Sequence, residues 1–143
     1  MYNAENVASY VIHKCIAVKQ PITNLELQKI LFCIQKWYLK NDNIAFIDDF
    51  IAEPYGPCIL SVYYQYSGYG CMEIDIQETN LVNIDEDDSK IIDSIIKEKL
   101  ALGTRPFALM KEVCKKSSAW DQTYNNGKGK QHIIRKELIK NEE

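Results

Sequence analysis

The feature that most constrains this fold is a long amphipathic helix, which the sequence predicts from Thr23 to about Lys40. Its start is marked by Thr23-Asn24-Leu25-Glu26, a capping box in which the threonine hydroxyl and the glutamate carboxylate each bind the other residue's amide. Apolar side chains recur at helical spacing and are expected to face inward: Leu27, Ile30, Leu31, Ile34, Trp37 and Tyr38. The charged side chains are expected to lie largely outward: Glu26, Lys29, Lys36 and Lys40. This pattern predicts a helical core built around one central helix.

Shorter helices are predicted on both sides of this long one, because apolar residues recur there at helical spacing. Their expected ranges are residues 3–19, 57–66, 104–114 and 133–139, together with a helix that follows the acidic run at 85–88, has its apolar face at residues 91–100 and is ended by Gly103. Pro57 is expected to preset the first turn of its helix. A short extended segment is expected around Phe50 and Ala52, and a small strand pair between Cys71 and Ile84. The predicted fold class is mainly α, a compact single-domain bundle of about six helices with a small β-ribbon.

Two segments near the C-terminus are expected to lack stable structure. Residues 125–131 contain the glycines and turn formers of a flexible loop, and residues 140–143 form a charged tail that should fray. Residues 117–121 are predicted to leave the preceding helix irregularly, with Trp120 anchoring this exit to the core. No linker or repeat divides the chain, and 143 residues is the usual length of one domain, so a single domain is expected over residues 1–143.

The composition argues against several functional classes. With 46% hydrophobic and 26% charged residues, the chain falls in the range of ordinary globular domains. A net charge of -3 argues against indiscriminate nucleic-acid binding. No apolar run approaches the roughly 18 residues of a membrane span, and the N-terminus lacks a signal-peptide layout, so a cytoplasmic protein without membrane contact is expected. The 5 cysteines form no C-x-x-C pair and are expected to be reduced thiols.

No catalytic centre is predicted from the sequence. Asp48 and Asp49 are adjacent, so in an extended segment their side chains point to opposite faces and do not act on one substrate. The acidic run at residues 85–88 lacks the spacing of a calcium-binding loop and is expected to cap the helix that follows. Ser61 has no nucleophile elbow, and Gly127-Lys128-Gly129-Lys130 lacks the spacing of a phosphate-binding loop. A non-enzymatic chain with no metal and no cofactor is therefore expected.

A stiff turn followed by tyrosines is the main candidate for a binding surface. Pro54 and Pro57 restrict the backbone around Gly56, which lowers the entropy cost of presenting the neighbouring side chains. Five tyrosines cluster nearby: Tyr55, Tyr63, Tyr64, Tyr66 and Tyr69. Such rings suit a protein interface, and they suit the rim of a core equally well. The candidate partner-binding residues are Asp49, Glu53, Tyr55, Tyr63 and Trp120. An alternative nucleic-acid patch consists of Lys128, Lys130, Arg135 and Lys136.

Several short motifs match one family pattern in the same order. They are Val7-Ala8-Ser9-Tyr10-Val11-Ile12, then Ile22-Thr23-Asn24-Leu25-Glu26-Leu27-Gln28-Lys29 through Trp37-Tyr38-Leu39, then Asp49-Phe50-Ile51-Ala52, Tyr55-Gly56-Pro57, Ser61-Val62-Tyr63 and Ala119-Trp120. Together they resemble the Panacea domain, a family that includes SocA-like antitoxins and phage-associated GepA-like proteins. The resemblance covers almost the whole chain. Glu53-Pro54, Leu60 and Lys115-Lys116 depart from residues that the family commonly has at these places.

The resemblance implies a compact helical antitoxin that binds a cognate toxin protein. Neutralisation by direct binding is the usual mode in the family, and delivery of the toxin to an ATP-dependent protease is a second mode. A phage or mobile-element protein that binds and inhibits a host protein is an alternative that the resemblance also allows. A nucleic-acid-binding regulator acting through the basic patch is the third hypothesis. The family commonly has a basic residue before the turn where this chain has Glu53, so the identity of the partner stays open if the local charge selects it.

Overall fold

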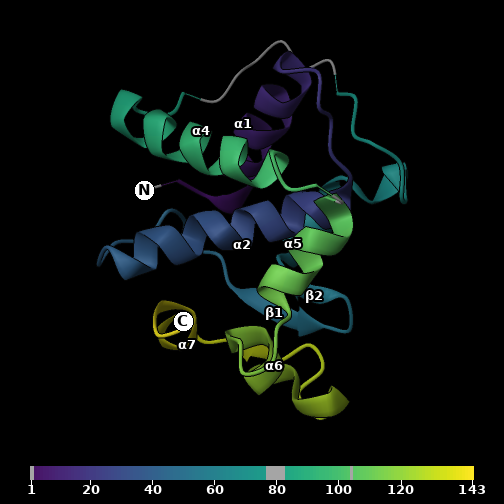
Figure 1. Cartoon of the computed structure of the whole chain (residues 1–143), viewed down its shortest axis with the longest axis vertical. Coiled ribbons are helices and arrows are strands. Elements are labelled where there is room, and N and C mark those ends of the chain that lie inside the picture. Colours follow the sequence, from purple (N-terminus) through teal and green to yellow (C-terminus); the bar gives the residue numbers. More distant parts are fainter. Residues whose placement is uncertain (1, 77–82, 104) are drawn as a thin grey trace.

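The computed structural model of the chain describes residues 2–76, 83–103 and 105–143 (Figure 1). Within these ranges the α-helices are α1 (Ala4–Ala17), α2 (Asn24–Lys40), α3 (Leu60–Gln65), α4 (Glu86–Leu100), α5 (Arg105–Val113), α6 (Ala119–Tyr124) and α7 (Lys136–Lys140). The strands are β1 (Phe50–Glu53), β2 (Gly56–Cys58) and β3 (Ile133–Ile134), and two short 3₁₀ helices are η1 (Ser67–Tyr69) and η2 (Asn125–Gly127). The predicted mainly α fold with a small β-ribbon is confirmed.

Helix α2 is the centre of the fold, as the sequence predicts. It contacts α1 and α4 on one side and α5, α7 and β2 on the other, so it forms the middle layer of the molecule (Figure 1). Its capping box is present, because the Glu26 amide donates to Thr23 Oγ1 at 3.2 Å and the Thr23 amide donates to Glu26 Oε1 at 3.0 Å. The buried apolar side chains of these elements form one continuous core around α2.

The predicted orientation of three α2 side chains is wrong. Glu26 and Lys29 were expected outward but are only 2% and 1% exposed, because elements pack on α2 from several sides and supply polar partners. Arg105 Nε donates to Glu26 Oε2 at 2.6 Å, and Lys29 Nζ donates to a backbone carbonyl described below. Trp37 was expected inward but is 40% exposed, since it lines two surface hollows beside α4 and beside α5 and the C-terminal tail.

The β-ribbon lies in a different part of the chain from the predicted one. β1 pairs antiparallel with β2, with Glu53 opposite Gly56, and β3 pairs with the other edge of β1. Residues 77–82 of the strand pair predicted between Cys71 and Ile84 lie outside the described residues. The described part of that segment contributes one isolated bridge, between Glu73 and Thr23. The sheet therefore forms where the chain turns back at residues 54–55.

Three further predictions are corrected by hydrogen bonds that the local pattern does not reveal. Pro57 lies in β2 instead of beginning a helix, and α3 starts at Leu60. The irregular exit predicted at residues 117–121 is confirmed only at its start, where Ser117 has φ +68°. Residues 119–121 instead begin α6, because Ser118 Oγ accepts from the Asp121 amide at 3.1 Å and caps this helix. Ile133 and Ile134 pair with β1 as a strand, so the last helix is confined to Lys136–Lys140. The helix predicted after the acidic run, with its apolar face at residues 91–100, is confirmed as α4.

The acidic start of α4 binds tyrosines of neighbouring elements. Asp88 accepts hydrogen bonds from the hydroxyls of Tyr2 and Tyr38, at 2.7 and 2.6 Å. Asp93 accepts from the Tyr10 hydroxyl at 2.6 Å, and burial raises the pKa of this tyrosine to about 12. The side chain of Asp85 was expected to cap α4 but makes no such bond. These carboxylates thus attach α4 to the layer formed by α1 and α2.

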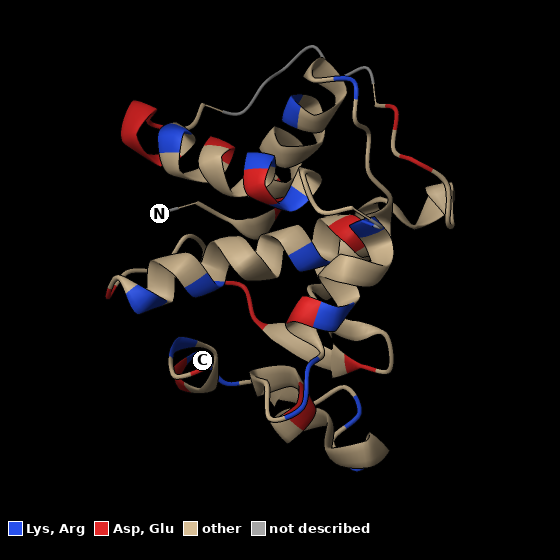
Figure 2. Cartoon of the chain, in the orientation of Figure 1, with Lys and Arg blue, Asp and Glu red and all other residues tan. Residues whose placement is uncertain are grey.

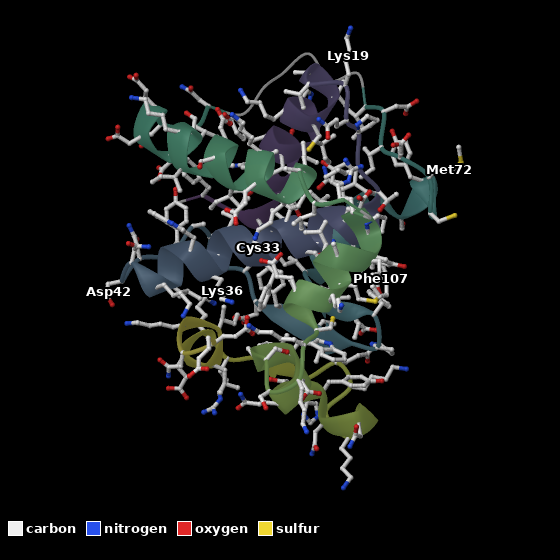
Figure 3. All side chains as sticks on the ribbon, in the orientation of Figure 1. Lys19, Cys33, Lys36, Asp42, Met72 and Phe107 are labelled. Carbon is white, nitrogen blue, oxygen red and sulfur yellow. The ribbon has the colours of Figure 1, made fainter. Side chains whose placement is uncertain are left out.

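The C-terminal residues, expected to be loose, are fastened to the rest of the chain. Residues 125–131 contain η2, and the Gln131 amide donates to the Ala52 carbonyl at 2.7 Å. Glu142 is 5% exposed, and its carboxylate accepts from the Ala119 amide at 2.7 Å and from Lys36 Nζ at 2.6 Å. Lys36 reaches from α2 toward α7 and the tail (Figure 3). A buried carboxylate of the tail thus joins α2 to the N-terminus of α6.

Replacing Glu142 by glutamine is expected to lower the free energy of unfolding by about 1–3 kcal/mol. The amide oxygen can still accept from Ala119, but the NH₂ group then faces the Lys36 ammonium, whose partner is lost. Urea denaturation monitored by circular dichroism measures the change. Glu143→Gln is the matched control, because its side chain is exposed at the next position. Equal stability of the two variants would contradict the role given to Glu142.

Candidate functional site

A hollow of about 260 Å³ lies where the N-terminal half of α2, the β1–β2 turn, α3 and the segment after η1 meet. We call it the tyrosine groove. Its lining residues are Asn24, Leu25, Gln28, Tyr55, Tyr63, Gly70 and Cys71. Four separate parts of the chain contribute to it, so the groove exists only in the folded protein.

One wall of the tyrosine groove is a row of aromatic rings. The rings of Tyr55 and Tyr63 stack with centroids 6.3 Å apart, and the Tyr64 ring meets Tyr63 edge-on at 5.8 Å. Tyr64 is 66% exposed, and Leu60 lies one helical turn before it on the same face of α3. Burial raises the pKa of Tyr55 far above its ordinary value, so its phenol stays neutral. The wall therefore presents apolar surface with neutral polar tips.

The floor of the groove is held by amide side chains of α2. Gln28 Oε1 accepts from the Ile59 amide at 2.8 Å, and Gln28 Nε2 donates to Asn24 Oδ1 at 3.3 Å. Asn24 Nδ2 in turn donates to the Tyr63 carbonyl at 3.0 Å. Both ends of α3 are thus bonded to α2, which fixes the position of the tyrosine row. The sequence analysis missed this network, because an apolar period gives no sign that polar side chains are buried.

A buried lysine of α2 binds the backbone of the β1–β2 turn. Lys29 Nζ donates to the Tyr55 carbonyl at 2.8 Å, and burial lowers the pKa of this lysine below its ordinary value. Gly56 has φ +127°, and a Cβ there would lie 3.0 Å from Lys29 Nζ and 3.1 Å from Cys114 Sγ. Only glycine suits both the backbone angle and this close approach. The turn therefore has one conformation, which aims the Tyr55 side chain at Tyr63.

The residues that line this groove coincide with three of the short motifs found in the sequence. Asn24 and Gln28 belong to the α2 motif, Tyr55 to the turn motif and Tyr63 to the α3 motif. Comparison with protein-family models, with curated proteins and with solved structures finds no match to this chain. The resemblance to the Panacea domain accordingly rests on the motifs and on their order.

Two of the predicted contact residues lie behind the turn. Trp120 Nε1 donates to the Glu53 carbonyl at 2.7 Å, and the indole stacks on Tyr124 with centroids 4.9 Å apart. Glu53 is 8% exposed, and its Oε1 has no hydrogen-bond partner within the described ranges. The prediction of Glu53 as a surface contact is corrected, because its strand is covered by α6. Trp120 is half-buried and ties α6 to β1.

Asp49 and one residue of the basic patch form an ion pair, and neither lines the tyrosine groove. Asp49 Oδ1 pairs with Lys136 Nζ at 2.8 Å, and Arg135 pairs with Glu137 at 2.7 Å. Lys128 and Lys130 are exposed. Carboxylates thus accompany half of the predicted nucleic-acid residues, and red and blue residues alternate in this region (Figure 2). Of the partner-binding candidates, the structure brings only Tyr55 and Tyr63 into one wall.

The described residues offer little for covalent or metal chemistry. Burial raises the pKa of Cys58 to about 11 and raises that of Cys114, so both thiols near the turn stay protonated and weakly nucleophilic at neutral pH. Over residues 2–76, 83–103 and 105–143, no group of three or more histidines, cysteines and carboxylates could hold a metal ion. None of the helices described is long and apolar enough to cross a membrane. The groove itself combines the aromatic wall with Cys71, an exposed free cysteine.

Proposed function

We propose that this chain is an antitoxin-like, protein-binding module of the cytoplasm that engages its partner through the tyrosine groove. The observation that carries the proposal is the Tyr55–Tyr63–Tyr64 row, which combines an exposed aromatic edge with a hollow held open by a rigid floor. Tyrosine is enriched in interface hot spots, and a preorganised surface binds at a lower entropy cost. The motif resemblance adds that the partner is a cognate toxin.

The size of the groove favours a protein partner over a free small molecule. Small-molecule sites usually enclose roughly 300–1,000 Å³. The tyrosine groove encloses about 260 Å³, and apolar residues outside the hollow extend the same surface. It accommodates one side chain of a partner while the surrounding rings contact the partner's backbone. Neutralisation by direct binding is the mode that this arrangement supports best, and delivery to an ATP-dependent protease would use the same contact.

Replacing Tyr63 by alanine is expected to weaken partner binding by about 10- to 100-fold, because a central aromatic anchor is lost. In the test, cells express the product of the neighbouring gene, either alone or together with this chain, and the surviving colonies are counted. The original chain is expected to restore growth, and the Tyr63→Ala chain is not. Purified proteins in a titration calorimeter then give the dissociation constants directly.

Trp37→Ala is the matched control. Like Tyr63, Trp37 is a partly exposed aromatic residue, but it lies on α2 and does not line the groove. Thermal unfolding of each variant separates a binding loss from a folding loss. If Tyr63→Ala restores growth as well as the original chain does, the groove is not the contact surface. If the neighbouring product is harmless alone, the antitoxin function fails, and a host protein becomes the partner to seek.

A further inference from the structure

An acidic edge borders the tyrosine groove. Cys71 lines the groove, and Glu73 and Asp75 follow it along the chain with exposed side chains. Ile74 between them is fully buried, so the two carboxylates lie on the outer side of this segment. Figure 2 shows acidic residues along the segment that descends beside η1, at the right-hand edge of the view.

Backbone bonds fix this edge beside α2. The Ile74 amide donates to the Ile22 carbonyl at 2.8 Å, and Glu73 forms a bridge with Thr23. Thr23 is the cap of α2 and directly precedes Asn24, which lines the groove. The acidic edge is therefore connected to the groove at two points, through Cys71 along its own segment and through Thr23, which precedes Asn24, across the bridge.

The carboxylates of this edge have no side-chain partner among residues 2–76, 83–103 and 105–143. In the part of the chain that the structure describes, neither Glu73 nor Asp75 forms an ion pair or a side-chain hydrogen bond. Glu26 and Glu142, by contrast, are buried and paired with Arg105 and Lys36. Lys29 is buried and bonded to the Tyr55 carbonyl, and Arg105 is bonded to Glu26 and to the Pro21 carbonyl. Among the described residues, the exposed carboxylates of Glu73 and Asp75 therefore have no cationic partner.

Exposed apolar side chains complete the surface. Met72 is 71% exposed and extends outward from the segment between Cys71 and Glu73 (Figure 3). Leu60 and Tyr64 are 40% and 66% exposed on the opposite, α3 side of the groove. A partner thus meets apolar surface on both sides of the hollow, and carboxylates along one side only.

We infer that the tyrosine groove binds a segment of a partner protein in which one large apolar side chain is flanked by lysine or arginine. The apolar side chain fills the hollow between Tyr63 and Cys71, and the flanking cation pairs with Glu73 or Asp75. Charge complementarity at the rim of an interface selects the partner and speeds association, while the buried anchor supplies affinity. This inference rests on the proposed function and specifies the partner's chemistry.

Capped glycine-serine peptides with a central Lys-Phe-Lys, Glu-Phe-Glu or Lys-Gly-Lys test the inference. Each peptide is titrated into the ¹⁵N-labelled chain, and amide chemical shifts report the site and the dissociation constant. Lys-Phe-Lys is expected to shift Asn24, Tyr63, Gly70 and Cys71, and to bind at least about tenfold more tightly than either other peptide. Its affinity is expected to fall when NaCl rises from about 0.05 M to about 0.5 M, since exposed ion pairs are screened.

Charge reversal identifies the groups responsible. The double variant Glu73→Lys with Asp75→Lys is expected to lose the preference for Lys-Phe-Lys over Glu-Phe-Glu. Glu5→Lys with Asp87→Lys makes the same change in net charge at exposed positions on α1 and α4, and is expected to keep the preference. Equal binding of the two phenylalanine peptides to the original chain, shifts outside the groove, or an absence of shifts would each overturn the inference.

The two proposals fail in distinguishable ways. If the chain neutralises a toxic neighbour through Tyr63 while the Glu73→Lys, Asp75→Lys variant neutralises equally well, the partner chemistry is wrong and the proposed function stands. If Lys-Phe-Lys binds in the groove but no neighbouring toxin is neutralised, the proposed function is wrong and the partner chemistry stands. A dimer in light scattering that Tyr63→Ala dissociates would assign the groove to a second copy of the chain and overturn the inference.

Discussion

Replacing Gln35 by methionine is expected to lower the free energy of unfolding by about 2–5 kcal/mol, because two buried backbone groups each lose their partner. Gln35 is 1% exposed at the middle of α2. Its Nε2 donates to the Phe46 carbonyl at 2.7 Å, and its Oε1 accepts from the Ala45 amide at 2.8 Å. Methionine keeps nearly the same volume and removes both polar atoms, so the loss reports on hydrogen bonding and not on a cavity.

Gln65→Met is the matched control for this prediction, because Gln65 is exposed at the end of α3. It is expected to change stability by less than about 0.5 kcal/mol. Urea denaturation with a shared slope gives the difference between the two variants. A loss at Gln35 no larger than the loss at Gln65 would show that water replaces the amide in this site.

Gln35 belongs to a set of polar residues on α2 that guide the segment from residue 45 to residue 59. Gln28 binds the Ile59 amide and Lys29 binds the Tyr55 carbonyl, so α2 holds this segment at three levels. The bonds made by Gln28 and Lys29 also shape the tyrosine groove. The central helix therefore acts as a template for the site as well as for the core.

The long helices follow from the sequence because their determinants are local. The capping box fixes the start of α2, and the isoleucine period fixes α4. The buried roles of Gln28, Lys29 and Gln35 do not follow, because their partners are backbone groups in distant parts of the chain. A period based on apolar residues assigns such positions to solvent, and only the complete fold shows that they are covered.

In the sheet and the groove, too, some features follow from the local sequence and others depend on distant parts of the chain. Phe50 and Ala52 were expected to be extended, and they lie in β1. The sequence of Ile133 and Ile134 resembles the start of the last helix. They form a strand instead because they pair with an edge of β1. Tyr55 and Tyr63 could be proposed together from the turn and the helix that follows. Their stacking, and the withdrawal of Glu53 into the interior, depend on α2 and α6.

Alkaline pH is expected to destabilise the fold by roughly 4–6 kcal/mol at about pH 10.5, because three buried thiols resist ionisation. Burial raises the pKa of Cys15 and Cys33 to about 12 and that of Cys58 to about 11, from an ordinary value of 9.0. Above about pH 9 the unfolded chain releases these protons while the native chain keeps them. The unfolded state then binds fewer protons, so stability falls as pH rises toward the native values.

Lys29 opposes this trend, since burial lowers its pKa and the unfolded chain keeps that proton longer as pH rises toward 10.5. One lysine is outweighed by three thiols, and Tyr10 adds to the loss above about pH 10. Urea denaturation between about pH 8 and about pH 10.5 measures the slope.

Cys15→Ala is expected to reduce the slope by about 1.4 kcal/mol per pH unit above pH 9. An unchanged slope in Cys15→Ala would contradict the assignment, because a thiol that ionises as readily in the native chain as in the unfolded chain contributes nothing to the pH dependence. A reduced slope would show that the packing of α1 against the core keeps this thiol from water at alkaline pH.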